Sequence, residues 1–454
     1  SNLTTFFFDD KELMNRFKSF LLYLRGSTLI DEEEKSYNNC IKDLTNSLDI
    51  NNKTKEIDDI NFINNEQIYI ARGDCFLKNG DINSALNDYE KALNISPSNS
   101  KIYNKLGNLK EESGDLDQAI KYYKQGIDLD PENESNYISI AKINTSLGKY
   151  SIALDNYKKA ILLNPNNPIN YFSIGKLMIE LNNLNSAINY FTKAIEVEPT
   201  FLVSYHSRAK AKSLNNDYEG AIRDYSIAIE KNPQSFLYFF RGQIHENMNN
   251  TIEASKDYTN LIKLDPTEQS FSTRATFRYK NKDFKGAIKD LSNAIQLNPK
   301  NPFFYNLRAS SEEKLGNFEN SIIDMNNAIN LDNKNSSYYF ARGFYYSKVG
   351  ENQKAIIDYS QTIALEEDNP KSDTYKNRGL VKLRLSKFLD AKKDFQKASS
   401  IDPQKPELKY LIGTSNYQLE KYEESIVNFS DALTLDPKNH IYLHDLCSSK
   451  YKIG

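Results

Sequence analysis

The stretch from Glu66 to Asn99 reads EQIYIARGDCFLKNGDINSALNDYEKALNISPSN, and residues 100–133 repeat its design as SKIYNKLGNLKEESGDLDQAIKYYKQGIDLDPEN. Apolar or small residues at positions 4, 7 or 8, and 11 predict one face of a first helix, and those at 20, 24, 27 and 28 predict one face of a second. A Gly-Asp turn separates the two helices, and a proline ends the second. Each block therefore predicts a pair of antiparallel helices.

The same pattern recurs along most of the chain with a period of 33 or 34 residues, apart from one repeat with two extra residues near Glu366. Position 8 is Gly or Ala in all eleven repeats, position 20 is Ala or Ser, and position 24 is Tyr, Phe, Leu or Met. One helix pair is too small to bury its own apolar faces, so the pairs must stack on one another. The eleven repeats begin at Glu66, Ser100, Glu134, Pro168, Leu202, Ser235, Glu268, Pro302, Ser336, Ser372 and Pro406.

These signature positions resemble those of the tetratricopeptide repeat (TPR) family over residues 66–439. The resemblance implies an all-α fold, a right-handed superhelical solenoid of tandem antiparallel helix pairs. It also implies a non-catalytic scaffold or adaptor for protein–protein interaction. The departures are few: Tyr stands where the family often has Trp, and Asn333 replaces one of the prolines.

The two ends of the chain differ from the repeats. Residues 1–65 are expected to form an N-terminal helical cap with a degenerate repeat and an Asn-rich loop, and residues 440–454 a terminal or truncated helix. Within the cap, residues 10–26 predict an amphipathic helix with an apolar stripe of Phe17, Phe20, Leu21 and Leu24. Residues 32–50 resemble a lone second helix, with Cys40 at the Ala position and Leu44 at the aromatic position.

Two charged positions vary together among the eleven repeats. Where position 7 is Arg, position 23 is Asp, and where position 7 is Leu or Ile, position 23 is Tyr or Asn. We expect each Arg to bond the Asp of its own repeat through two hydrogen bonds. The alternative is a row of arginines that binds phosphates or carboxylates. The predicted pairs are Arg72–Asp88, Arg208–Asp224, Arg241–Asp257, Arg274–Asp290, Arg308–Asp324, Arg342–Asp358 and Arg378–Asp394.

The composition excludes several classes of function. Lys+Arg total 58 and Asp+Glu 61, so no overall basic field exists to attract nucleic acid or an anionic membrane. The three cysteines, Cys40, Cys75 and Cys447, lie far apart and predict no disulfide framework, which favours a reducing, cytoplasmic location. The sequence shows no apolar run long enough to span a bilayer and no evident signal peptide.

Catalytic motifs are scarce, so the sequence predicts neither an enzyme nor a cofactor. It contains no GxGxxG, GxxxxGK[ST], HExxH or GxSxG. His440, His444 and Cys447 share one helical face and offer a weak metal site, but Cys447 also occupies a core position, and we expect no metal there. The acidic run at 31–34 is expected to be a solvated helix start.

In the TPR family, positions 2, 5, 6, 9, 12 and 13 line a concave groove, and the resemblance places the partner there. Repeats two to five give this groove a basic zone, and repeats six to nine an aromatic zone. An extended ligand with acidic and apolar portions fits both zones, although the lysines also reflect composition and the rings also fill gaps between repeats. The candidate groove residues are Lys101, Asn104, Lys105, Asn108, Lys142, Lys176, Lys210, Phe239, Phe240, Phe340 and Phe344.

Two specialised binding modes of the family are not predicted. The clamp that holds acidic chaperone tails is incomplete, because Ser139 and Ser173 stand where it needs Asn and Arg. The row of Asn at position 6 that some relatives carry is also missing. Two alternatives to a scaffold remain: a recognition superhelix cut from a larger enzyme or chaperone machine, and a structural solenoid that assembles with itself. The oligomeric state is left open.

Overall fold

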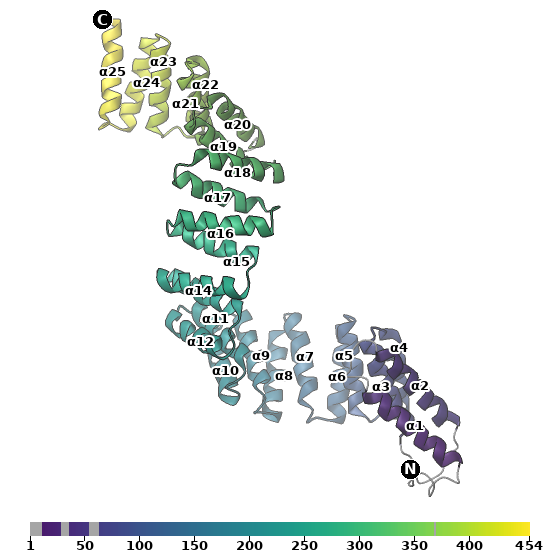
Figure 1. The fold of residues 1–454 in the computed structure, drawn as a ribbon. Coiled ribbons are helices and arrows are strands. Elements are labelled where there is room, and N and C mark those ends of the chain that lie inside the picture. The colour runs from purple at the N-terminus through teal and green to yellow at the C-terminus, as the bar shows by residue number, and fades with distance from the viewer. Residues whose placement is uncertain (1–10, 29–35, 54–62, 367–368) are drawn as a thin grey trace. The chain divides into compact units, whose positions relative to one another are not determined.

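The computed structural model describes residues 11–28, 36–53, 63–366 and 369–454, and over these residues it contains helices and no strand. Consecutive helices lie side by side in antiparallel pairs (Figure 1), which confirms the predicted all-α class. The chain divides into two compact units, Ser1–Lys231 and Asn232–Gly454. In each unit the core is a row of small clusters between neighbouring helices, such as Tyr89 and Ala92 with Leu106.

The helix bounds follow the repeat pattern. The first unit contains α1 (Lys11–Thr28), α2 (Tyr37–Lys53), α3 (Asn65–Lys78), α4 (Ile82–Ile95), α5 (Ser100–Glu112), α6 (Leu116–Leu129), α7 (Glu134–Ser146), α8 (Tyr150–Leu163), α9 (Pro168–Glu180), α10 (Leu184–Val197), α11 (Leu202–Leu214) and α12 (Tyr218–Lys231). The second contains α13 (Ser235–Asn247), α14 (Thr251–Leu264), α15 (Glu268–Lys280), α16 (Phe284–Leu297), α17 (Pro302–Lys314), α18 (Phe318–Leu331), α19 (Ser336–Lys348), α20 (Asn352–Leu365), α21 (Ser372–Arg384), α22 (Phe388–Ile401), α23 (Pro406–Gln418), α24 (Tyr422–Leu435) and α25 (His440–Ile453).

The turn between the two helices of each repeat depends on position 15. This residue has a positive φ in all eleven repeats, from +54° at Asn182 to +83° at Gly350. Only Gly adopts this left-handed conformation without a steric penalty, and Asn tolerates it better than most residues. Accordingly, position 15 is Gly in five repeats and Asn in three, while Lys282, Ser386 and Glu420 adopt the conformation despite their side chains.

A close contact between positions 8 and 24 holds the two helices of a repeat together. A Cβ atom on Gly175 would lie 2.6 Å from a ring carbon of Phe191, which is fully buried. The rings of Tyr89, Tyr123, Phe395 and Phe429 block the glycine of their own repeats in the same way. The first helix therefore approaches the ring so closely that only a very small residue fits at position 8.

In each of the seven repeats that have Arg at position 7 and Asp at position 23, the arginine donates two hydrogen bonds to the aspartate of its own repeat. The closest nitrogen–oxygen distances are 2.6–2.8 Å, and the Asp side chains are 1–6% exposed. A second cation, at position 11, contacts the same carboxylate in three repeats: Lys212, Arg278 and Lys382.

The arginines of repeats one, five, seven, eight, nine and ten also bond the preceding second helix, which the sequence pattern did not predict. Their Nη1 atoms donate to a Thr or Ser hydroxyl, or to the Asn326 side chain, at 2.7–3.2 Å. The acceptor lies at position 25 of the preceding second helix. Before the four repeats that lack the Arg, this position holds Glu90, Lys124, Lys158 or Gln396 instead. The arginine thus joins two helices of its own repeat to a third helix.

The N-terminal helices form another pair of the same kind. Gly26 of α1 lies against Leu44 of α2, and Arg25 bonds both carboxylate oxygens of Asp43. The sequence suggested that the helix containing Cys40 and Leu44 has no partner helix. In the structure, α1 packs against it and completes the pair. Of the expected stripe on α1, Phe20 packs toward Cys40 whereas Leu21 and Leu24 stay exposed. The acidic run at 31–34 lies outside the described residues.

The prediction that the cysteines form no disulfide is wrong in one case. Cys40 of α2 and Cys75 of α3 are joined by a disulfide, with Cα atoms 6.3 Å apart and both side chains fully buried. Their separation of 35 residues is close to one repeat, and stacking brings such residues into contact. Cysteine usage therefore no longer supports a reducing compartment. Cys447 is free and exposed.

The contact at position 8 predicts that two glycines respond differently to alanine. A Cβ on Gly379 would lie 2.6 Å from the Phe395 ring, whereas on Gly343 the nearest atoms are 3.2 Å away. We expect Gly379→Ala to lower the free energy of unfolding by roughly 1–3 kcal/mol through overpacking. Gly343→Ala should be close to neutral, because better helix propensity offsets a smaller clash. Chemical denaturation followed by circular dichroism measures both, and equal effects would contradict this account.

The ion pairs predict a large cost when one partner is removed. Asp290 is fully buried and contacts both Arg274 and Arg278. Asp290→Ala removes the buried carboxylate that two cations share, of which only Arg278 has another carboxylate, Asp283, nearby. It should lower the free energy of unfolding by roughly 3–5 kcal/mol. The control is Asp431→Ala, at an exposed position of α24, which should change it by less than about 0.5 kcal/mol. Denaturation of both variants in parallel tests this, and a loss at Asp290 as small as the control's would contradict it.

Candidate functional site

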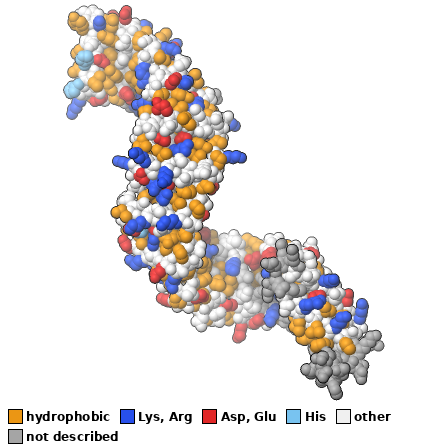
Figure 2. Space-filling view, viewed as in Figure 1, with side chains coloured by type: hydrophobic (Ala, Val, Ile, Leu, Met, Phe, Trp, Pro, Cys, Tyr) orange, Lys and Arg blue, Asp and Glu red, His pale blue; other side chains and the backbone are white. Residues whose placement is uncertain are grey.

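The candidate groove residues lie on the first helix of each repeat. In the first unit these helices are α3, α5, α7, α9 and α11, and in the second α13, α15, α17, α19, α21 and α23. Figure 2 shows hydrophobic and charged side chains interspersed over the face of each unit that is in view. No large area of one charge sign stands out in that view.

Three lysines of the first unit form an exposed row. Lys142, Lys176 and Lys210 occupy position 9 of consecutive repeats, on α7, α9 and α11, and all are exposed. Among the described residues, no carboxylate lies within 4.0 Å of their amino groups. The charge of Lys210 also helps to lower the pKa of His206, although burial of that imidazole is the larger cause. The row is therefore a set of ammonium groups without a counter-ion in the part of the chain that the structure describes.

The candidate residues of repeat two are engaged within the protein. Lys105 lies 2.6 Å from a carboxylate oxygen of Asp74, and Asn104 donates to the side chain of Asn136. Asn108 accepts a hydrogen bond from the hydroxyl of Tyr123. The fourth candidate, Lys101, is exposed, and its ammonium has no ion-pair partner among the described residues. Apart from Lys101, the candidate lysines without an ion-pair partner among the described residues therefore begin at repeat three.

The aromatic candidates of the second unit are half-buried and contact other rings. Phe239 and Phe240 lie edge to face at 5.2 Å, and Phe340 contacts the buried Tyr359 at 5.7 Å. The ring of Phe344 lies 5.1 Å below the ammonium of Lys348. These rings thus fill space between helices as well as facing solvent.

A hollow opens between α13, α15 and α17. It measures about 760 Å³ and is open to solvent. Its aromatic lining consists of Phe239, Tyr258, Phe277, Phe303 and Phe304, with Gln243, Thr273 and Thr276 among its polar residues. Phe303, which the groove positions include, is 47% exposed. An apolar side chain flanked by peptide groups fits such a lining.

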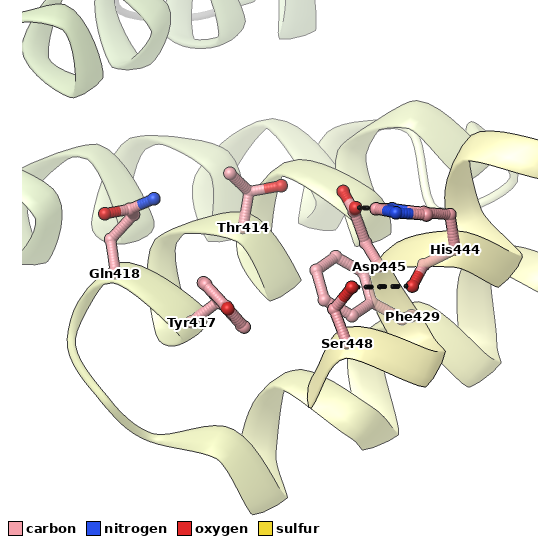
Figure 3. Close-up of a pocket in the computed structure, with 7 residues that line it drawn as sticks. All are labelled: Thr414, Tyr417, Gln418, Phe429, His444, Asp445 and Ser448. Carbon is pink, nitrogen blue, oxygen red and sulfur yellow. Dashed lines mark hydrogen bonds and ion pairs between the residues drawn. The ribbon is translucent and has the colours of Figure 1, made fainter. Parts of the chain in front are cut away.

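A second hollow of about 520 Å³ lies between α23 and α25 (Figure 3). His444 contacts Asp445, which also accepts a hydrogen bond from Tyr410 at 2.8 Å. Burial, reinforced by Asp445, raises the pKa of Tyr410. Ser448 donates to the backbone carbonyl of His444 and not to its ring, so these residues form no nucleophilic relay. In the described part of the chain, no group of three His, Cys, Asp or Glu side chains is placed to hold a metal ion.

The sequence reasoning missed a third hollow, on the side of the second helices. It measures about 1190 Å³ and lies between α6, α7 and α8, with Ile120, Ile140 and Ile152 among its lining. It occurs where repeat three has Ile140 and Asn156 in place of the Arg and Asp. The missing ion pair was the feature of the sequence that could have indicated this hollow. Among the described residues, no helix is long and apolar enough to cross a membrane.

Comparison with known proteins identifies the repeat. Models described as TPR repeat or tetratricopeptide repeat match residues 73–114, 100–133, 141–181, 170–201, 237–268, 304–335 and 406–439. No curated protein sequence matches the chain.

Solved structures of such repeats resemble parts of the chain. MamA is 27% identical over 35% of this chain and 93% of its own, with a TM-score of 0.33. Yeast Tom70 is 18% identical over 85% of this chain and 95% of its own, with a TM-score of 0.34. YrrB, whose structure is titled as having an unusual peptide-binding site, is 17% identical over 40% and 94%, with a TM-score of 0.35. With its recurring helix pairs and matching family models, the chain belongs to the tetratricopeptide repeat proteins.

Proposed function

We propose that this chain is a scaffold that binds a protein segment along the face formed by the first helices of its repeats. The observation that carries the proposal is the exposed row of Lys142, Lys176 and Lys210, which lacks counter-ions among the described residues. Charges that are not used within the fold are available to a partner of opposite sign. Tetratricopeptide repeat proteins are generally non-catalytic scaffolds, and this proposal assigns no chemistry to the chain.

The second unit contributes a different kind of subsite. The hollow around Phe239, Phe277 and Phe303 is lined by rings and by neutral polar side chains, apart from Glu246 and Lys280. The one carboxylate in its lining, Glu246, is already paired with Lys280 at 2.8 Å. A neutral apolar side chain of the partner fits this hollow better than a charged one does, since a charge would be desolvated without compensation. We therefore propose a partner with both acidic and apolar anchors.

The basic row predicts that charge reversal abolishes partner capture. The test is a pull-down from extract with the full chain and with a Lys142/Lys176/Lys210→Glu variant. The matched control is Lys124/Lys158/Lys193→Glu, which makes the same charge change at exposed positions of the second helices. We expect the first variant to lose partners that the wild type and the control retain. Equal recovery by all three proteins would refute the proposed surface.

The aromatic hollow predicts a loss of affinity without a loss of stability. Phe303→Ser removes a half-exposed ring that lines the hollow, and Leu389→Ser removes an equally exposed side chain of α22. We expect Phe303→Ser to weaken binding of a captured partner by about tenfold, because aromatic anchors supply much of the buried area in interfaces. Leu389→Ser should leave binding unchanged. Calorimetric titration measures the affinities, and thermal denaturation should show both variants folded.

A further inference from the structure

The first two repeats show how this face holds a carboxylate. The hydroxyl of Tyr89, at position 24, donates to Asp74 at position 9 over 2.6 Å. The ammonium of Lys105, at position 6 of the next repeat, lies 2.6 and 2.9 Å from the two oxygens of the same Asp74. A phenol and an ammonium from adjacent repeats thus bind one carboxylate within the protein.

Other repeats also match the hydroxyl at position 24 with a carboxylate. Tyr258 donates to Glu246 at 2.8 Å, and Lys280 of the next repeat bonds the other oxygen of Glu246. Tyr123 donates to Glu111 at 2.7 Å. In repeats one, two and six, therefore, an acidic side chain of the same repeat satisfies the buried tyrosine at the edge of the groove.

Repeat three lacks this carboxylate. Position 9 is Lys142, which is exposed and has no acidic partner within 4.0 Å among the described residues. For the buried Tyr157, burial raises the pKa of the phenol, and the neighbouring hydroxyls of Thr145 and Ser173 act in the opposite direction.

The spacing places these groups together. Lys142 precedes Tyr157 by 15 residues and Ser173 by 31, and the same intervals separate Asp74 from Tyr89 and from Lys105. Repeat three thus has the ammonium of Lys142 and the hydroxyls of Tyr157 and Ser173 at these positions, but no carboxylate among the described residues to go with them.

We propose that Lys142, Tyr157 and Ser173 form a receptor for an acidic side chain of the partner segment, a refinement that rests on the proposed groove. An ammonium and two hydroxyls supply charge-assisted hydrogen bonds to a carboxylate. The next repeat offers a simpler version, because Lys176 and Ser207 have the same spacing but Phe191 carries no hydroxyl.

The distance between these two subsites sets a register for the partner. If the first helices of consecutive repeats are spaced like neighbouring helices in general, at about 10 Å, an extended chain that advances about 3.3 Å per residue covers this distance in about three residues. Acidic residues about three positions apart in the partner therefore reach consecutive subsites.

The test measures fluorescence anisotropy with the full chain at about 0.15 M salt, where long-range charge effects are screened. The probe is a fluorescein-labelled peptide of three Gly-Ser-Glu units, and its control has Gln in place of Glu. Tyr157→Phe removes one hydroxyl and keeps the ring, as Phe191, Phe395 and Phe429 do naturally at this position. We expect Tyr157→Phe to weaken binding of the Glu peptide about tenfold, and Lys142→Met to weaken it at least as much. Lys124→Met, off the groove, should have no effect.

The outcomes separate this receptor from the groove itself. If Lys142→Met weakens the Glu peptide but Tyr157→Phe and Ser173→Ala do not, the lysine acts alone and the receptor is refuted, while the proposed function stands. Equal affinity for the Glu and Gln peptides, or no binding of the Glu peptide at about 1 mM, also refutes it. The pull-down with the three-lysine variant decides the proposed function independently, because it does not depend on these peptides.

Discussion

The contact between position 8 and the side chain at position 24 is the constraint on which the rest of each repeat depends. A glycine such as Gly175 lets the first helix press against the ring of Phe191, and a larger residue would push them apart. Where position 8 is Ala, as in Ala275 and Ala309, position 24 can be a flexible Leu291 or Met325. The short distance between the two helices fixes their relative orientation. It therefore determines which side chains face the Arg–Asp pair on one side of the contact and which face solvent on the other.

The side chains on the two sides of that contact differ in whether their polar groups are bonded within the fold. On one side, Arg at position 7 joins Asp at position 23 to a hydroxyl of the preceding repeat, and these groups are used up within the fold. On the other side, the hydroxyl at position 24 meets residues that change from repeat to repeat: Asp74 and Asn108 accept from it, and Lys142 cannot. Repeats with the same architecture thus present different chemistry along the groove, as an array must do to recognise an irregular ligand.

Much of this could be predicted from the sequence, because eleven copies serve as an internal comparison. The helix pairs and the residues that vary together at positions 7 and 23 follow from position within the period. The ion pair of Arg25 and Asp43 was missed because it does not fit the repeat spacing. These residues are 18 positions apart, whereas the partners in the other pairs are 16 apart. The Arg-Gly dipeptide, shared by Arg25-Gly26 and Arg72-Gly73, was the signal that could have found this pair.

Contacts between neighbouring repeats were also not predicted from the sequence. They change which of the candidate groove residues are available to a partner. Lys105 belongs to the basic zone by sequence, yet its charge is balanced by Asp74 of the repeat before, and the disulfide of Cys40 and Cys75 likewise joins neighbouring repeats. An acidic partner that reached Lys105 would have to displace Asp74, and it would gain little because one carboxylate replaces another. At Lys142 no such competitor exists among the described residues, so the full interaction is available. In the proposed groove, selectivity would then depend on which repeats already contain their own acid, and not on lysine content.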